Sequence, residues 1–465
     1  MKNVLLIQPP YKDMIHPAEA IVAPLGLAYI AAYLRENGVG VKIFDPTPLN
    51  LDMQDLGKIL QNKDYDIVGI TTNTPLIGKA IEIADLIKRI NPTVKIIFGG
   101  LHVTALDEET LEYSKSVDIA VRADGEITML ELACELERRN PDLSKIDGIT
   151  YRDGKRIRVN KPRALIENLD ELPFPARDLL PMEKYHPATK MYHRLPFTTM
   201  MTSRGCPFHC IYCAYARGKT RFRSADNIVQ EIEELINVYG TKDISFYDET
   251  FTANKRRILE ICDLIIKKDL DITWGCYSRV NTIDRGLIEK MTTAGCKTIS
   301  YGVESGSTRM LEIMKKGITL EQVERAITLT KKAGVKCSTS FVFGIPGETP
   351  KSVRKTIEFA KKIDPTFVHF NMITPWPGTE LYENLVKEGK IDKGDWKNYA
   401  EKKGMHIPVI KLEGFTQREL EAIPKRAYRT FYLRPRKIFE HLSSLNSPYK
   451  VKGYFDAMKA FFKVT

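Results

Sequence analysis

Three cysteines lie close together in the segment TSRGCPFHCIYCAYARG, which runs from Thr202 to Gly218. Cys206, Cys210 and Cys213 are separated by three and then by two residues. Thiolates spaced in this way on a short loop can hold three corners of a cubane iron–sulfur cluster. The fourth iron would then stay open to a substrate or cofactor, as one position of a catalytic zinc site does. The spacing therefore predicts a cluster that takes part in chemistry and not in electron transfer alone.

A structural zinc site and a set of unreactive core thiols both fit these cysteines less well. A structural zinc ion needs four ligands, usually from paired Cys-x2-Cys units, and the sequence has no second pair. His209 is a poor fourth ligand because it is adjacent to Cys210 in the chain. Unreactive core thiols are ordinary when they are scattered, as the remaining cysteines are. Most of these single cysteines are predicted to be small core residues, although Cys276 or Cys337, near the ends of barrel strands, could face the cavity: Cys134, Cys262, Cys276, Cys296 and Cys337.

The composition of the 465-residue chain predicts two or three globular domains. The net charge of +11 is compatible with nucleic acid, an anionic ligand or an anionic membrane surface, and does not choose among them. No apolar run approaches the roughly 20 residues of a membrane span. The N-terminal MKNVLLIQPP predicts a first strand and not a signal peptide, because its short apolar run stops at Pro9. We therefore expect a cytoplasmic protein with reduced cysteines.

The first 130 or so residues alternate between strand-like and helical stretches. Such alternation predicts a doubly wound parallel sheet with its ligand site at the carboxyl ends of the strands. Residues 148–160 predict a β-hairpin after that domain, and the proline-rich residues 169–181 predict a linker. The predicted strands are VLLIQ, VKIFD, YDIVGIT, KIIFGG and VDIAVR, and the predicted helices are GLAYIAAYLRENG, GKAIEIADLIKRIN and ITMLELACELERR.

A second alternating series begins near Phe197 and gives six βα units in about 180 residues. This predicts a partial parallel barrel, because a full eight-unit barrel typically needs about 250 residues. Active sites of such barrels lie at the carboxyl ends of the strands, and Cys206 comes just after the first strand. The predicted strands are FTTMMTS, DISFY, ITWGCY, KTISYG, KCSTSFVFG and FVHFNMI.

The cysteine spacing, with Tyr212 before the last cysteine, resembles the signature of the radical S-adenosylmethionine (SAM) enzymes. The resemblance implies a partial (β/α)6 barrel of the TIM type and a [4Fe–4S] cluster held by Cys206, Cys210 and Cys213. It also implies that the open iron binds SAM and that one electron cleaves SAM to a 5′-deoxyadenosyl radical. Five further segments are similar to family motifs: FRS at 222–224, YDETF at 247–251, YGVESGS at 301–307, FGIPGET at 343–349 and PWPGT at 375–379. The implied SAM-binding residues are Tyr212, Asp248, Glu249, Glu304, Gly344, Pro346 and Gly347.

The N-terminal domain resembles the Rossmann-like cobalamin-binding domain of one branch of these enzymes, through PLGLAYIAAYLRENG, DIVGITTNT, FGGLHVTA and VRADGE. Glycines and hydroxyls in the loops after the strands can pass a flat corrin ring closely. The D-x-H-x-x-G pattern that supplies a histidine to cobalt in other cobalamin enzymes is absent from the sequence, and His102 follows one strand too late. A lone loop histidine is more often a polar surface residue, and a scaffold that has lost cobalamin is the alternative for the domain. The implied cobalamin-binding residues are Leu25, Gly26, Thr71, Thr72, Asn73, Gly99, Gly100, His102, Gly125 and Glu126.

The C-terminal region is predicted to be helical and basic. Tyr449, Val451, Phe455, Met458 and Phe462 can share one helix face, with lysines at its edges. Such a helix could lie in a membrane interface and bring the enzyme to a lipid. The alternative is a terminal helix packed on the barrel with its lysines in water. Nucleic acid binding is the third interpretation of this region and the least favoured.

Together these observations predict a cobalamin-dependent radical SAM enzyme that C-methylates an unactivated carbon of a hydrophobic, lipid-like substrate. The predicted domains are 1–145 for cobalamin, 146–195 for hairpin and linker, 196–380 for the barrel and 381–465 for the C-terminal region. The resemblance also implies an electron donor such as ferredoxin or flavodoxin. One alternative is ring contraction, cyclisation or rearrangement without methyl transfer, and a second is an iron–sulfur redox sensor. The sequence leaves open the substrate, its stereochemistry, the lower face of the cobalt and the oligomeric state.

Overall fold

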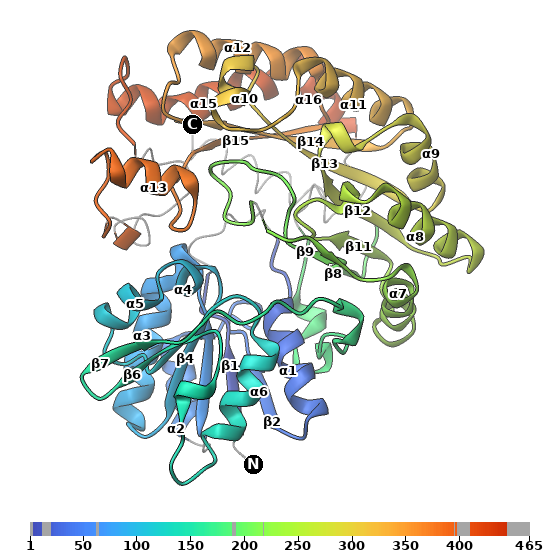
Figure 1. The fold of residues 1–465 in the computed structure, drawn as a ribbon. Helices are drawn as coiled ribbons and strands as arrows, with labels where there is room; N and C mark the ends of the chain where they lie inside the picture. Colours follow the sequence, from blue (N-terminus) through green and yellow to red (C-terminus); the bar gives the residue numbers. More distant parts are fainter. Residues whose placement is uncertain are drawn as a thin grey trace.

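The computed structural model describes residues 3–11, 20–61, 65–187, 192–216, 218–394, 396–397 and 410–443. Two sheets dominate it, one in each half of the molecule (Figure 1). The first sheet has the strand order β2-β1-β3-β4-β5-β6-β7. Its strands are β1 (Asn3–Ile7), β2 (Gly40–Phe44), β3 (Ile67–Thr71), β4 (Lys95–Gly99), β5 (Ile119–Val121), β6 (Ile149–Asp153) and β7 (Arg156–Val159).

Helices cover both faces of this first sheet. Side chains of α1 and α6 pack on one face with Val4, Leu6 and Ile97, and side chains of α2 to α5 pack on the other with Leu5, Ile7 and Phe98. Strands β1 to β5 pair in parallel, which confirms the predicted doubly wound sheet. The helices are α1 (Leu25–Glu36), α2 (Met53–Gln61), α3 (Ile77–Ile90), α4 (Leu101–Ala105), α5 (Asp107–Tyr113) and α6 (Glu126–Glu135).

The predicted hairpin is present as β6 and β7. It pairs antiparallel with β5 and so extends the first sheet instead of standing apart from it. Backbone pairing explains this position, because β5 would otherwise be an edge strand with unpaired N–H and C=O groups.

The second sheet has six parallel strands in the order β15-β14-β13-β12-β11-β8. Each strand therefore lies beside its predecessor among the barrel strands, and the sheet stays open between β8 and β15. This confirms the predicted partial barrel. Its strands are β8 (Phe197–Met200), β11 (Asp243–Phe246), β12 (Thr273–Ser278), β13 (Cys296–Glu304), β14 (Lys336–Phe343) and β15 (Phe367–Met372).

The outer face of the barrel strands is apolar and the inner face is polar. Phe341, Phe343 and Phe370 belong to the core between the sheet and the helices. The alternate residues Ser340 and Asn371 keep part of their surface exposed, because successive side chains of a strand point to opposite faces. The surrounding helices are α7 (Ala225–Tyr239), α8 (Lys255–Lys267), α9 (Arg285–Thr293), α10 (Thr308–Ile313), α11 (Leu320–Lys332), α12 (Pro350–Ile363) and α13 (Glu380–Lys387).

Helix α15 (Gln417–Tyr432) covers the β15 edge of the barrel. The Tyr432 hydroxyl accepts the N–H of Val368 at 2.9 Å, and the Tyr428 hydroxyl accepts the N–H of Phe370 at 3.1 Å. These bonds satisfy backbone groups that an edge strand leaves open. Helix α16 (Pro435–Ser443) follows, whereas the predicted amphipathic helix around residues 449–462 lies outside the described residues.

The predicted linker is anchored by a buried ion network. Arg177 is fully buried and forms an ion pair with Glu231 of α7 at 2.6 Å, and Glu231 also pairs with Arg223. Just after residues 169–181, Tyr185 donates to the buried Asp45 at 2.9 Å. The linker thus contacts both halves of the molecule.

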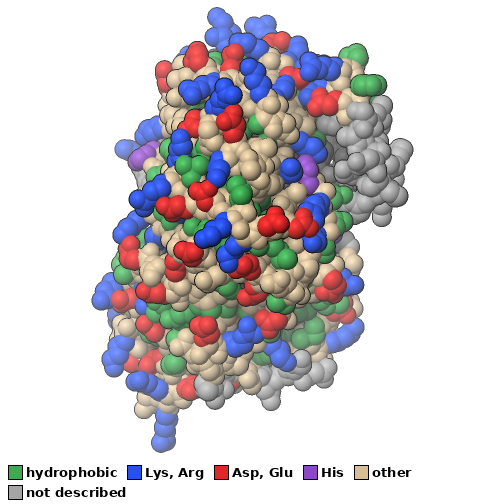
Figure 2. Space-filling model, turned by 90° about the vertical axis from the view of Figure 1, so that its right-hand side faces the viewer, with side chains coloured by type: hydrophobic (Ala, Val, Ile, Leu, Met, Phe, Trp, Pro, Cys, Tyr) green, Lys and Arg blue, Asp and Glu red, His purple; other side chains and the backbone are tan. Residues whose placement is uncertain are grey.

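On the face of the molecule in Figure 2, basic and acidic side chains are interspersed and neither forms a dominant patch. In the part of the chain that the structure describes, no helix is both long and apolar enough to cross a membrane.

Candidate active site

The cysteine loop is closed at its base by a short antiparallel ribbon of β9 (Ser203–Arg204) and β10 (Arg221–Phe222). Gly205 begins the loop with φ of +85°, and a Cβ there would lie 2.6 Å from the carbonyl oxygen of Lys219. Only glycine fits such a turn without displacing backbone.

Two backbone hydrogen bonds fix the middle of the loop. The N–H of Ile211 donates to Met314 at 3.1 Å, and the N–H of Leu381 donates to Ile211 at 2.8 Å. The loop is therefore held against the end of α10 and the start of α13, at the carboxyl ends of the barrel strands.

The three cysteines share a largely buried environment. Cys206 and Cys210 are buried and Cys213 is half-buried. Burial raises the pKa of the Cys213 thiol, and the nearby Cys210 and Cys206 raise it further. Three neighbouring thiols on one loop fit the three corners of a cubane cluster. The described residues contain no group of three His, Cys, Asp or Glu side chains that could ligate a single metal ion.

Arg279 supplies positive charge beside the thiols, and the sequence analysis did not identify it. It is buried, donates to the Cys210 sulfur at 3.6 Å and stacks over the ring of Phe208 at 3.8 Å. A cation at this position stabilises thiolates. Its place directly after β12, at the carboxyl end of a barrel strand, was the signal that could have identified it.

The two carboxylates of the YDETF segment have different surroundings. Asp248 accepts the N–H groups of Thr202 at 2.6 Å and Ser203 at 3.0 Å, and lies 3.8 Å from Arg257. Its oxygens therefore position the start of the cysteine loop. Among the described residues, Glu249 Oε2 is buried and has no hydrogen-bond partner. Burial raises the pKa of Glu249 to about 7.

Glu304 lies at the end of β13 in a left-handed conformation with φ of +73°. It is buried and paired with Lys316 at 2.9 Å, and Lys316 also donates to the Tyr212 hydroxyl at 3.5 Å. A left-handed non-glycine residue costs about 1–3 kcal/mol and is concentrated at functional sites. Lys316 was missed because a Lys-Lys-Gly sequence is typical of an exposed turn.

The FGIPGET segment forms a tight loop after β14. Gly344 has φ of +93° and Gly347 has φ of +89°, and Pro346 lies half-buried between them. Glu348 accepts the N–H of Gly344 at 2.7 Å, and burial raises the pKa of Glu348 to about 7. Glu348 thus closes the loop from inside.

In the N-terminal half, the predicted cobalamin loops lie at the carboxyl ends of β3, β4 and β5. Thr72 donates through its N–H at 2.6 Å and its hydroxyl at 2.9 Å to the carbonyl of Gly99. A Cβ at Gly100 would overlap the carbonyl oxygen of Thr72. Asn73 caps a short 3-10 helix through the N–H of Leu76 at 3.1 Å. These bonds hold the two loops against each other.

Three other predicted cobalamin residues are partly open. Thr71 is half-buried, and a Cβ at Gly99 or at the exposed Gly26 would meet nothing within 4 Å. Leu25, by contrast, is buried in a small core with Tyr29.

His102 is buried rather than at the surface. Its Nδ1 lies 3.1 Å from the Thr74 hydroxyl, and its ring meets Trp396 edge-on at 4.7 Å. Burial lowers the pKa of His102 to about 4. Its Nε2 is buried without a hydrogen-bond partner among the described residues. The expectation of a surface histidine is therefore wrong, because Trp396 covers this ring from a distant part of the chain.

The loop after β5 connects the two predicted cofactor sites. Glu126 accepts from Arg204 at 2.6 Å, and Asp124 accepts from Arg204 at 3.2 Å and from Arg221. Gly125 lies between the two carboxylates, and a Cβ there would approach Ile30 to 2.9 Å. The structure thus brings the VRADGE loop directly against the base of the cysteine loop.

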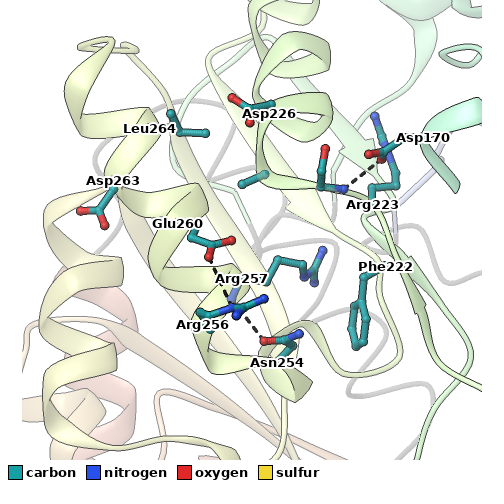
Figure 3. A pocket seen from close by; sticks show the side chains of 12 residues that line it. Asp170, Phe222, Arg223, Asp226, Asn254, Arg256, Arg257, Glu260, Asp263 and Leu264 are labelled. Atoms are coloured by element: carbon teal, nitrogen blue, oxygen red, sulfur yellow. Dashed lines mark hydrogen bonds and ion pairs between the residues drawn. The ribbon is translucent and has the colours of Figure 1, made fainter. Parts of the chain in front are cut away.

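A cavity of about 600 Å³ lies elsewhere, between the N-terminal end of α7 and one side of α8 (Figure 3). Arg256 pairs with Glu260 at 3.5 Å on its wall. Asp170 accepts the N–H of Ser224 at 2.9 Å beside it. None of the predicted cofactor-binding residues is among those that line this cavity.

Comparison with known proteins gives two family matches. Residues 200–360 match the radical SAM superfamily, and residues 11–133 match the B12 binding domain. An uncharacterized methyltransferase of Pyrococcus horikoshii is 39% identical, over 94% of this chain and 95% of the relative. The anaerobic magnesium-protoporphyrin IX monomethyl ester cyclase of Rubrivivax gelatinosus is 30% identical, over 99% of this chain and 82% of the relative.

Among solved structures, the fold is similar to a radical SAM methyltransferase, TsrM, from Kitasatospora setae with cobalamin and a [4Fe–4S] cluster bound. The TM-score is 0.70 at 21% identity, over 83% of this chain and 78% of that chain. These matches confirm the resemblance seen in the sequence and its three cofactors, the [4Fe–4S] cluster, SAM and cobalamin.

Proposed function

Because the chain belongs to the radical SAM superfamily, in the branch with an N-terminal B12-binding domain, we propose that it methylates an unactivated carbon. The observation that supports this most is the contact between the loop after β5 and the base of the cysteine loop, through Arg204 and Glu126 at 2.6 Å. A methyl donor and a radical source must act on one substrate. The proposed cobalamin and cluster sites are adjacent, as this requires.

Cys206, Cys210 and Cys213 would hold the cluster, with Arg279 offsetting their negative charge. The buried oxygen of Glu249, which has no hydrogen-bond partner in the part of the chain that the structure describes, fits the ammonium group of SAM, since a carboxylate pairs well with a cation. Asp248 would position the loop and not bind SAM, because its oxygens already accept from the loop. When bound, the cluster supplies the electron that cleaves SAM, and cobalamin supplies the methyl group for transfer.

Cobalamin would lie over the carboxyl ends of β3 to β5. Gly99 and Gly26 fit a flat ring because nothing lies within 4 Å of a Cβ built at either. His102 would support this surface from below as a neutral ring, since it is buried against Trp396. Glu126 would act through Arg204 instead of contacting the corrin.

The inner face of the barrel is the proposed substrate surface. Tyr277 keeps 36% of its surface exposed there and lies next to Ser300 in the register of β12 and β13. Ser340 and His369 are neighbours on β14 and β15. Hydroxyl and imidazole groups favour a substrate with hydrogen-bonding groups. The hydrophobic, lipid-like substrate and the membrane contact stay predictions that depend on the segment around residues 449–462.

A second candidate function is cyclisation or rearrangement without methyl transfer. The Rubrivivax gelatinosus relative carries the name of a cyclase and aligns along 99% of this chain. The same cofactors and the same barrel would serve that reaction, with no methyl group leaving cobalamin. The products of SAM therefore distinguish the two functions.

The test is anaerobic purification with cobalamin supplied, followed by iron, sulfide and cobalt analysis. Reaction with SAM and a strong reductant follows, and 5′-deoxyadenosine and S-adenosylhomocysteine are measured. We expect about four irons and one cobalt per chain and both products. Only 5′-deoxyadenosine would favour rearrangement, and neither product from a loaded protein would contradict both functions. Cys213→Ala is the matched control, because it removes one cluster ligand and both products should disappear.

A further inference from the structure

A cluster of four charged side chains joins the base of the cysteine loop to the N-terminal domain. We call Asp124, Glu126, Arg204 and Arg221 the interdomain ion cluster. Arg204 and Arg221 are directly opposite each other in the β9–β10 ribbon. Two like charges in this position repel unless a carboxylate lies between them, and Asp124 accepts from both.

The interdomain ion cluster is largely buried. The side chains of Glu126 and Arg221 are 3% and 6% exposed, and those of Arg204 and Asp124 are 14% and 16% exposed. Breaking a buried pair leaves an uncompensated charge, so such contacts resist separation more strongly than surface ion pairs do. The contact is therefore a firm connection between the two halves.

On the N-terminal side, the connection continues to the proposed cobalamin surface. The N–H of Ala123 donates to the Thr104 hydroxyl at 3.0 Å, and that hydroxyl donates to the carbonyl of Gly100 at 2.8 Å. Ala123 has φ of +60°, a conformation that a non-glycine residue adopts only where its surroundings hold it. The loop after β5 is thus fixed to the loop after β4.

On the barrel side, the connection ends at the cluster ligands. Arg204 precedes Gly205 and Cys206 in the chain, and the turn at Gly205 has no room for a Cβ. A shift of Arg204 would therefore be carried directly to Cys206. From Gly100 to Cys206, every step is a hydrogen bond, an ion pair or a short stretch of backbone.

We propose that the interdomain ion cluster couples the two cofactor sites, so that bound cobalamin stabilises the cysteine loop and the bound cluster strengthens cobalamin binding. The inference rests on the proposed function, since it takes the loops after β4 and β5 as the cobalamin surface. Arg204 and Glu126 are then positioning residues. Coupling between two sites is reciprocal, so it can be measured from either side.

The experiment measures how fast an iron chelator bleaches the reconstituted cluster, with and without excess hydroxocobalamin. In the wild-type protein we expect hydroxocobalamin to slow bleaching about fivefold or more. The rate ratio is the bleaching rate without hydroxocobalamin divided by the rate with it. In Glu126→Gln, a change 80 residues from Cys206 in the chain, this ratio should fall to within about twofold of one. The affinity for hydroxocobalamin, titrated with and without the cluster, should show the same loss of coupling.

Two further variants make the result interpretable. Arg204→Lys keeps the charge but not the fork that bridges both carboxylates, and it replaces Glu126→Gln if that protein does not fold. Arg194→Gln removes an exposed pair with Asp271 at 2.5 Å and should leave the rate ratio unchanged. Hydroxocobalamin that binds without slowing bleaching in the wild type, or an equal ratio in all variants, would overturn the coupling alone. Absence of hydroxocobalamin binding would remove the proposed function and the coupling with it.

Discussion

At the scale of single residues, the proposed SAM site places two neighbouring carboxylates in different surroundings. Glu249 and Asp248 are adjacent carboxylates at the end of one strand. Asp248 accepts hydrogen bonds from the cysteine loop, whereas Glu249 Oε2 has no hydrogen-bond partner among the residues that the structure describes. Sequence alone gives both the same expectation. The difference depends on which of the two side chains the preceding strand directs toward Thr202.

Glu249→Gln should weaken SAM binding by about tenfold or more, because it removes a charge-assisted bond worth about 1.5–3 kcal/mol. With a pKa of about 7, Glu249 is protonated below that pH, so wild-type affinity should fall as the pH drops from 8 to 6. The variant should show no such slope. Equilibrium binding of SAM to the cluster-loaded protein measures both effects.

Asp248→Asn is the matched control for that measurement. It should lower cluster content and thermal stability, because its acceptors for Thr202 and Ser203 are changed. Equal SAM affinities in wild type and Glu249→Gln at pH 8 would contradict the role given to Glu249.

His102 predicts a pH dependence of stability. Its pKa is about 4 in the folded protein against an ordinary value of 6.5, so the unfolded chain binds its proton more readily. The contribution of the neutral His102 ring to the free energy of unfolding is fully present above pH 6.5. It is lost as the pH falls toward 4, by about 3 kcal/mol in all. His102→Gln should flatten this part of the curve of unfolding midpoint against pH. A parallel curve for the variant would show that another group is responsible.

At the scale of elements, the cysteine loop depends on one glycine. In Gly205→Ala, the new Cβ would meet the Lys219 carbonyl at 2.6 Å, so the loop must shift. We expect at least half of the cluster iron to be lost, measured after anaerobic reconstitution. Gly240→Ala tests left-handed strain alone, because Gly240 has φ of +62° with nothing within 4 Å of a Cβ. That control should keep its iron and lose only about 1 kcal/mol of stability.

The stability of the linker should depend on its buried ion pairs. Glu231→Gln leaves Arg177, which is fully buried, without its carboxylate partner. Losing one partner of a buried pair costs about 3–5 kcal/mol, so the thermal midpoint should fall by several degrees. Lys219→Gln removes an exposed pair with Glu167 at 2.5 Å and should change the midpoint little. Comparable shifts in the two variants would contradict a special role for Arg177.

At the scale of the whole molecule, local sequence patterns predicted the two sheets. Contacts between residues far apart in the chain determined burial and ion pairing, which those patterns did not predict. Runs of β-favouring residues that alternate with stretches of helical periodicity sufficed to predict both sheets. The spacing of the three cysteines indicated the loop after the first barrel strand, and their role as cluster ligands stays a prediction. The pairing of Glu126 with Arg204 joins residues 78 positions apart, and no local pattern contains it. Likewise, His102 is buried by Trp396, nearly 300 residues later. Burial and ion pairing across domains follow from the docked structure and cannot be seen in a single segment.

The chain after the barrel returns to the N-terminal domain and should hold the two halves together. Trp396 is 2% exposed, packs on His102 and joins the core of the first sheet, and the neighbouring Lys393 pairs with Glu109. Trp396→Ala should cost about 3–5 kcal/mol at this contact. Because the loss falls on the N-terminal half, calorimetry should show that half unfolding at a lower temperature, as a transition separate from the barrel. Tyr113→Ala is the control, since Tyr113 touches the same tryptophan at 5.8 Å but is 53% exposed. A single transition, shifted as a whole in Trp396→Ala, would mean that the ion cluster and the linker suffice to keep the halves cooperative without this returning segment.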